Sequence, residues 1–147
     1  MLLTDHTHQL ALRPLRYEFP AARGDQYDDN WLVVEGTATT PERSWSFTEP
    51  CLLTDEARRI STWLRGVAAG TVAVTTPELS FLEPLLAFSL ADRGEEGATI
   101  RVHLSLEAAP PGEPEIFQPS VEITLDGAAL RAAADDWDRA LAPFPPR

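Results

Sequence analysis

The sequence predicts an α+β fold in which two helices pack on one face of a mostly antiparallel sheet. Three observations lead to this prediction: stretches in which apolar and polar residues alternate, connections short enough for hairpins, and two stretches with helical periodicity. Along the chain, strands are followed by a helix, further strands and a second helix. Because hairpin-sized connections join antiparallel neighbours, we expect this class rather than alternating parallel strands and helices.

The predicted strands share a period of two, in which every second residue is apolar. The clearest is 98–108, where the apolar side chains from Ile100 to Leu106 form one face. Pro14 interrupts the first strand and predicts an edge position or a bulge, because proline cannot donate to a strand ladder. The predicted strands are 9–19, 31–39, 43–49, 78–84, 86–92, 98–108 and 120–126.

The two predicted helices cover about residues 55–69 and 127–141. In each, apolar residues recur at steps of three and four, which is the spacing of one helix face. Thr54 or Asp55 is expected to cap the first helix, and Asp126 is expected to cap the second.

The length of the chain suits a single domain covering residues 1–147. We expect residues 1–8 to be a loose N-terminal segment, because chain ends are usually poorly ordered. Residues 142–147 are predicted to form a short C-terminal tail, since Pro143 stops the second helix. The four prolines of residues 109–119 predict an extended loop.

The composition excludes several classes of protein. Twenty-three acidic and twelve basic residues give a net charge of −11, whereas non-specific nucleic-acid binding requires clustered cations. No apolar run approaches the ~18 residues of a membrane span, and the segment MLLTDHTHQL lacks the pattern of a signal peptide. The single cysteine, Cys51, excludes an internal disulfide and a multi-cysteine zinc site. We therefore expect neither nucleic acid nor a membrane as partner, and no cofactor.

The negative charge is concentrated in residues 17–56. Nine acidic residues and only Arg23 and Arg43 give this stretch a charge of −7. A field of this kind steers a basic partner toward the protein, and a merely solvated surface is the alternative interpretation.

Within that stretch, the segment ARGDQYDDN at 22–30 has the composition of a loop. Its acidic and aromatic residues are the predicted partner-binding site, because basic partners are attracted by carboxylates and interface hot spots favour Trp and Tyr. The predicted contacts are Asp25, Asp28, Asp29 and Trp31, with Tyr27 as an aromatic anchor.

The same carboxylates suggest an alternative, a small-molecule or calcium-binding module. Calcium prefers oxygen ligands, which this loop supplies. However, the loop lacks the Asp-x-Asp-x-Asp-Gly spacing and the distant bidentate glutamate of the best-known calcium loops.

Catalytic and metal-binding patterns are weak. Cys51 lies in an apolar context that suits an inert buried thiol, and His103 is expected to be a half-exposed sheet residue. His6 and His8 have a metal-ligand spacing but lie in the segment expected to be loose. Among the arginines only Arg58 and Arg59 are adjacent, too few in sequence to favour an anion site.

Four segments, taken in order, resemble the bacterial WapI-type immunity proteins. The similarity runs over about residues 15–112, and the motifs DDNWLVV and WSFTEPCL are its more specific parts. The segments are YEFPAARGDQYDDNWLVVEG, RSWSFTEPCLLTDEARRISTWL, ELSFLEP and VHLSLEAAPP.

This resemblance implies a small cytoplasmic protein that binds and neutralises the toxin domain of a polymorphic secreted toxin. In the family's best-known pairing the toxin is an RNA-cleaving nuclease, and no catalytic residue is implied for the immunity protein. A basic nuclease cleft and an acidic inhibitor are electrostatically compatible. We therefore predict a non-enzymatic immunity protein with a basic toxin domain as partner, and leave the oligomeric state open.

Overall fold

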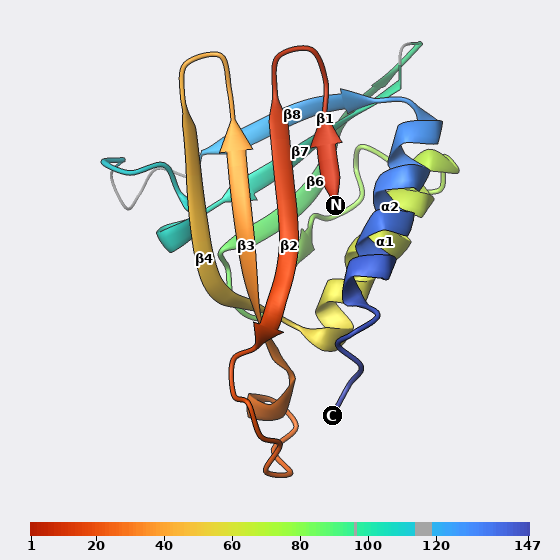
Figure 1. Cartoon of the computed structure of the whole chain (residues 1–147). Helices are drawn as coiled ribbons and strands as arrows, with labels where there is room; N and C mark the ends of the chain where they lie inside the picture. Colours follow the sequence, from red (N-terminus) through yellow and green to blue (C-terminus); the bar gives the residue numbers. More distant parts are fainter. Residues whose placement is uncertain (96, 114–118) are drawn as a thin grey trace.

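The computed structural model describes residues 1–95, 97–113 and 119–147, which form two four-stranded antiparallel sheets and two α-helices (Figure 1). The N-terminal sheet has the strand order β1 (Leu2–Thr4), β2 (Gln9–Tyr17), β3 (Trp31–Thr39) and β4 (Ser44–Leu53). The C-terminal sheet has the order β5 (Leu79–Ser80), β6 (Leu86–Gly94), β7 (Gly97–Leu104) and β8 (Ser120–Leu125). The predicted α+β class and antiparallel pairing are confirmed.

The strands form two sheets instead of the single sheet that the sequence analysis envisaged. Helix α1 (Thr54–Ala68) begins directly after β4 and carries the chain from one sheet to the other. Period-two patterning identifies strands but does not show which strands share a sheet, so this division was not visible in the sequence.

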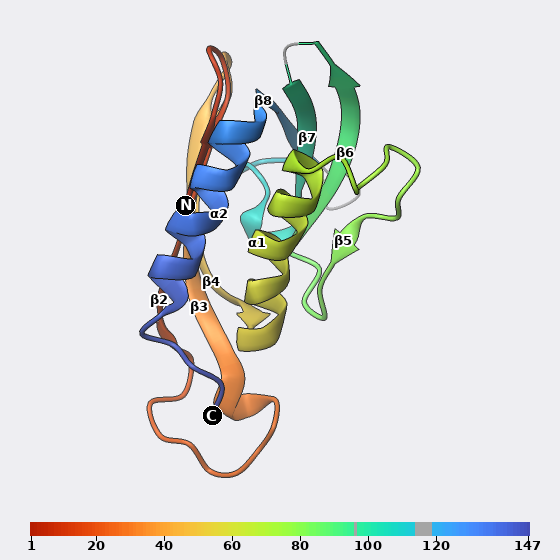
Figure 2. The same ribbon diagram turned by 90° about the vertical axis from the view of Figure 1, so that its right-hand side faces the viewer.

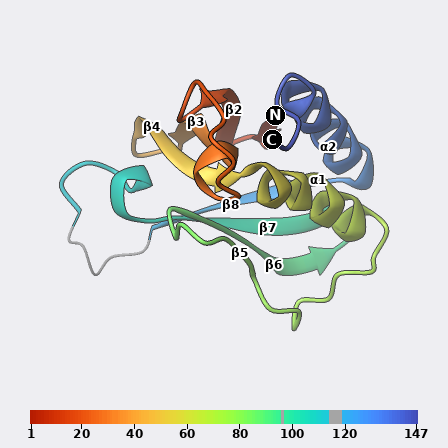
Figure 3. The ribbon, with the colours of Figure 1, turned by 90° about the horizontal axis from the view of Figure 1, so that it is seen from below.

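The two helices fill the space that opens between the sheets. Helix α2 (Gly127–Leu141) lies beside β1 and β2, while α1 packs against α2 and places Trp63 6.0 Å from the Phe88 ring of β6 (Figures 2 and 3). The sheets approach each other where β1 and β2 meet β8. Buried side chains from both sheets and both helices form one hydrophobic core cluster, which fixes the position of the loops at either end of the strands.

The predicted cap of α2 is confirmed, and that of α1 is wrong. The Asp126 carboxylate accepts a hydrogen bond from the Ala129 N–H at 2.7 Å, and α2 begins at the next residue. At α1 the Glu56 carboxylate instead accepts from the Leu53 N–H at 3.0 Å. The Thr54 hydroxyl does not cap the helix and donates to the Asn30 side chain at 2.9 Å.

Several predicted strands differ from the observed ones at their ends. The clearest, 98–108, ends at Leu104, and Leu106 lies in a 3₁₀ turn (Leu106–Ala108) with 53% of its surface exposed instead of completing the apolar face. The pairing of β2 with β3 shifts register between Pro14 and Arg16, which confirms the predicted bulge. The predicted strand 78–84 shortens to β5, because the Leu82 N–H donates to the Glu56 carboxylate at 2.7 Å instead of to a neighbouring strand. The centre of the predicted proline-rich loop, residues 114–118, lies outside the described residues.

Residues 1–8 are ordered, contrary to the expectation of a loose segment. Strand β1 pairs with residues 9–11 of β2, and Leu3 is completely buried in the core. The prediction failed because the pattern of three residues is too short to show a strand, whereas one buried leucine and an antiparallel partner suffice to hold it.

Candidate functional site

The predicted binding site lies on a long connection between β2 and β3, which we call the acidic loop (residues 18–30). It projects beyond one end of the N-terminal sheet (Figure 1). A short 3₁₀ turn at Asp28–Asn30 leads into β3. The structure therefore brings together the predicted contact residues, but their side chains do not all face the same way.

Asp29 faces the inside of the loop. Its carboxylate accepts hydrogen bonds from the N–H groups of Arg23 at 2.8 Å, Gly24 at 2.7 Å and Asp25 at 3.0 Å. These hydrogen bonds, of which the one from Arg23 has the largest effect, lower the pKa of Asp29 below its ordinary value. Burial of the carboxylate raises the pKa, but by less. Only 2% of the surface of Asp29 is exposed, so this carboxylate holds the main chain of the loop and is not part of its exposed surface.

Asp25, Tyr27 and Asp28 face outward. The Asp25 Oδ1 atom accepts from the N–H groups of Tyr27 at 2.8 Å and Asp28 at 2.9 Å, so this carboxylate also stiffens the turn that it occupies. All three side chains are exposed, and Tyr27 has 54% of its surface open. Trp31, the first residue of β3, is half-buried. Three of the five predicted residues thus form an exposed surface.

The base of the loop is tied to the rest of the molecule by Asn30. Its Oδ1 atom accepts hydrogen bonds from the Thr54 hydroxyl and from the Arg147 N–H, both at 2.9 Å. Its Nδ2 atom donates to the carbonyl of Gln26 at 2.9 Å and to the main-chain oxygen of Arg147 at 3.0 Å. One buried amide therefore connects the loop, the first turn of α1 and the C-terminal tail.

The Arg147 side chain closes the same base. Its guanidinium donates to the carbonyls of Phe19 at 2.8 Å, Pro20 at 3.2 Å and Asp29 at 3.0 Å. It also lies 3.5 Å from the centre of the Tyr17 ring, which is a cation–π contact. The sequence analysis missed Asn30 and Arg147, since nothing in the sequence indicates that residues so far apart meet.

The acidic residues of 17–56 do not share one face. Asp29 and Glu56 are buried and hydrogen-bonded, and Glu35 pairs with Arg13 at 3.2 Å on the strands. Glu42 lies in the β3–β4 turn, at the end of the sheet opposite the acidic loop (Figure 1). The charge that faces outward at the loop is thus smaller and more local than the sequence total of −7 suggested.

The geometry gives the calcium alternative no support. Both oxygens of Asp29 and one oxygen of Asp25 already accept main-chain N–H groups. Across residues 1–95, 97–113 and 119–147, no group of three or more His, Cys, Asp or Glu residues is placed to hold a metal ion.

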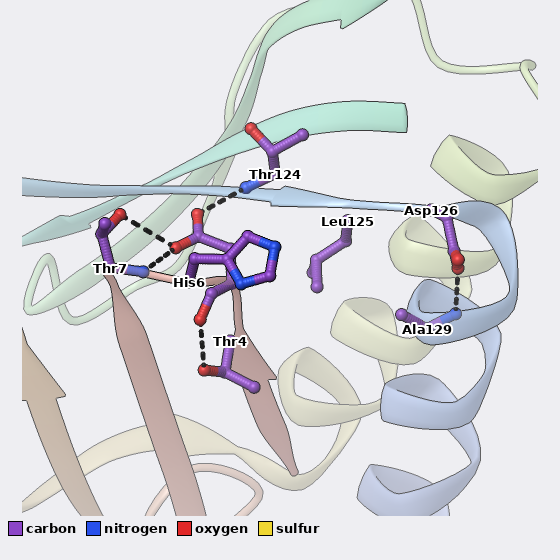
Figure 4. Close-up of a pocket in the computed structure, with 8 residues that line it drawn as sticks. Thr4, His6, Thr7, Thr124, Leu125, Asp126 and Ala129 are labelled. Atoms are coloured by element: carbon purple, nitrogen blue, oxygen red, sulfur yellow. Dashed lines mark hydrogen bonds between the residues drawn. The ribbon is translucent and has the colours of Figure 1, made fainter. Parts of the chain in front are cut away.

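Asp5 ties the two sheets together beside a cavity of about 720 Å³ (Figure 4). Its Oδ1 atom accepts from the N–H groups of Thr7 and His8, each at 2.8 Å, and its Oδ2 atom accepts from the Thr124 N–H of β8 at 3.1 Å. Burial raises the pKa of Asp5, but these hydrogen bonds lower it to about 2. The carboxylate is thus a structural link, and His6 remains an exposed residue at the cavity edge.

The two other candidate residues have structural settings. Cys51 is completely buried. This burial is the main reason why the pKa of its thiol is raised to about 12, and nearby carboxylates including Glu49 add to the effect. Such a thiol is unreactive at neutral pH, as its apolar sequence context predicted. The His103 Nε2 atom lies 3.3 Å from the Ser89 hydroxyl and 3.8 Å from the Glu78 carboxylate on the partly exposed face of the sheet.

The protein is thus a two-sheet α+β domain with an exposed acidic loop that is braced from within. The family model described as the immunity protein WapI-like family matches residues 1–145, and the chain belongs to this family. Membership implies neutralisation of a toxin, and proteins of this kind are typically not enzymes. No curated protein matches the chain. Within the part of the chain that the structure describes, no helix is long and apolar enough to cross a membrane.

Proposed function

We propose that the protein neutralises its cognate toxin by binding a basic toxin domain, with a nuclease as the expected toxin, through the exposed part of the acidic loop. Asp25, Tyr27 and Asp28 are the proposed contacts. The observation that supports this assignment is the orientation of the loop: these three side chains face solvent, while Asp29 fixes the main chain beneath them. We further propose that this occurs in the cytoplasm.

The bracing of the loop favours tight binding. Ordering a flexible loop at an interface costs free energy, and a loop already held in its bound shape avoids most of that cost. The hydrogen bonds of Asp29 and Asn30 provide this order before any partner arrives. Tyr27 adds an aromatic side chain with few rotatable bonds, which is typical of interface hot spots.

Charge favours a basic partner. A nuclease must hold phosphates, so its cleft carries arginine and lysine side chains. Asp25 and Asp28, on a protein with a net charge of −11, attract such a surface and speed up the encounter more than they strengthen the final complex. Asp29 then acts as a positioning residue, and half-buried Trp31 borders the contact surface.

The direct test is binding to the cognate toxin domain. We expect calorimetry at low ionic strength to show a complex with a Kd below ~1 µM, and equimolar protein to abolish the activity of the toxin domain. Absence of binding at micromolar concentration and low salt would refute the proposal. Binding without any loss at Asp25→Lys, Asp28→Lys or Tyr27→Ala would instead place the interface on another surface.

A further inference from the structure

A groove lies beside α1, and Thr71, Val72 and Leu79 also line it. Thr71 and Val72 belong to the segment that leads from α1 to β5 (Figure 2). The volume of the groove is about 470 Å³, which is within the range of small-molecule sites. The lining residues relevant to binding are Asp55, Arg58, Arg59, Trp63, Val72 and Leu79.

One wall of the groove is fixed by Gly66. Its carbonyl accepts hydrogen bonds from the Thr71 N–H at 3.0 Å, the Thr71 hydroxyl at 3.1 Å and the Val72 N–H at 3.4 Å. A Cβ atom at Gly66 would lie only 3.1 Å from Val72 Cγ2, so glycine permits this close approach. The groove is therefore formed in advance and does not depend on a ligand.

The floor of the groove is apolar. Trp63 is half-buried and packs against Phe88, while Leu79 is 9% exposed. With Val72 on the wall, these side chains offer a surface for an aromatic or aliphatic group.

The rim of the groove is cationic, although the protein as a whole is strongly acidic. Across the described ranges, no carboxylate lies within salt-bridge distance of Arg58 or Arg59, whereas five other arginines have such a partner. The Arg58 guanidinium donates to the carbonyls of Thr54 at 2.7 Å and Phe144 at 3.2 Å. The exposed Arg59 guanidinium lies 5.8 Å from the centre of the Phe81 ring.

We propose that this groove binds an apolar carboxylate. The apolar group would rest on Trp63, Val72 and Leu79, and the carboxylate would pair with Arg59, for which the described residues provide no salt-bridge partner. Asp55, one helical turn before Arg59, lines the same groove and opposes the ligand's charge. This proposal does not rest on toxin binding by the acidic loop, although Asp55 also lines a pocket that Tyr27 of that loop shares.

The proposal is tested with 4-phenylbutyrate as the probe and its uncharged amide as the matched control, by following the Trp63 indole N–H in an NMR titration. For a ligand of this size we expect a Kd of the order of 1 mM for the carboxylate and binding ~10-fold weaker for the amide. Arg59→Gln should abolish this preference, and Asp55→Asn should strengthen binding of the carboxylate but not of the amide. Arg13→Gln, on the N-terminal sheet, is the control and should change neither.

A second arm uses the peptide acetyl-Phe-Asp-amide, which carries the same chemistry on a polypeptide. Binding of phenylbutyrate alone identifies a free small molecule as the ligand, and equal or tighter binding of the peptide identifies a segment of a partner protein. The proposal is wrong if neither probe shifts the Trp63 signal at 10-fold the expected Kd, or if Arg59→Gln leaves the preference for the carboxylate intact.

Discussion

The two connections that flank β3 differ in length and in the contacts that hold their shape. The β3–β4 turn, residues 40–43, is closed by a main-chain hydrogen bond from the Thr40 N–H to the Arg43 carbonyl at 2.8 Å. The exposed Thr40 hydroxyl adds a hydrogen bond to the Glu42 carboxylate at 3.0 Å. The acidic loop joins β2 to the same strand with residues 18–30, far more than an antiparallel connection needs. Its shape depends on side chains: Asp29 and Asn30 from within the loop, and Arg147 from the C-terminal tail.

This difference separates a structural connection from a functional one. A tight turn is fixed by its own few residues, so it costs little conformational entropy and presents little surface. A long loop remains ordered only if buried polar groups hold it, and the molecule supplies these groups at the base of the acidic loop. The exposed carboxylates at its tip thereby gain a defined geometry.

The largest expected effect comes from Asn30→Ala. The substitution removes four hydrogen bonds and leaves the Thr54 hydroxyl, which is 2% exposed, without its acceptor. We expect the free energy of unfolding to fall by about 2 kcal/mol, measured by urea denaturation. The matched control is Thr40→Ala in the short turn, which should cost less than ~0.5 kcal/mol. Equal losses would show that the acidic loop is no more dependent on side chains than the turn.

A smaller and local effect is expected when the pH falls. The pKa of Asp29 is lower in the folded protein than its ordinary value of 3.8, mainly because the Arg23 N–H donates to the carboxylate. A depressed folded pKa stabilises the loop above the ordinary value, and that stabilisation is lost as the pH falls through the folded pKa.

We therefore expect the amide signals of residues 23–25 to shift together below about pH 4 in an NMR titration, and the Thr40 amide to be unaffected. Asp29→Asn should remove the transition and leave these amides exchanging rapidly with solvent at neutral pH. Retained protection in the variant would mean that the three N–H bonds do not order the loop.

The adjacent Asp28 provides the smallest expected effect on stability. Its side chain is exposed, so Asp28→Asn should change the free energy of unfolding by less than ~0.5 kcal/mol. Urea denaturation of this variant beside Asp29→Asn compares two neighbouring aspartates directly. A loss at Asp28 as large as that at Asp29 would contradict the outward orientation of Asp28.

These two aspartates also show which features of the site could not be predicted from the sequence. Helix α2 was predicted with its observed bounds because Asp126 and the apolar stripe that follows are local signals. Asp28 and Asp29 have the same chemistry and differ only in direction, which is set by the path of the main chain. The contacts of Asn30 with Arg147 and Thr54 depend on how the helices and sheets pack, as does the division into two sheets, and such long-range geometry has no local pattern.

The most direct test of the central claim compares charge reversal at the two connections. The association rate with the cognate toxin domain is measured at low salt for Asp25→Lys combined with Asp28→Lys, and for Glu42→Lys in the β3–β4 turn. We predict that the loop variant associates ~10-fold more slowly or worse, that Glu42→Lys stays within ~2-fold of the unmodified protein, and that added salt narrows the difference. Equal association rates for the two variants would contradict the assignment of the acidic loop as the toxin-binding surface.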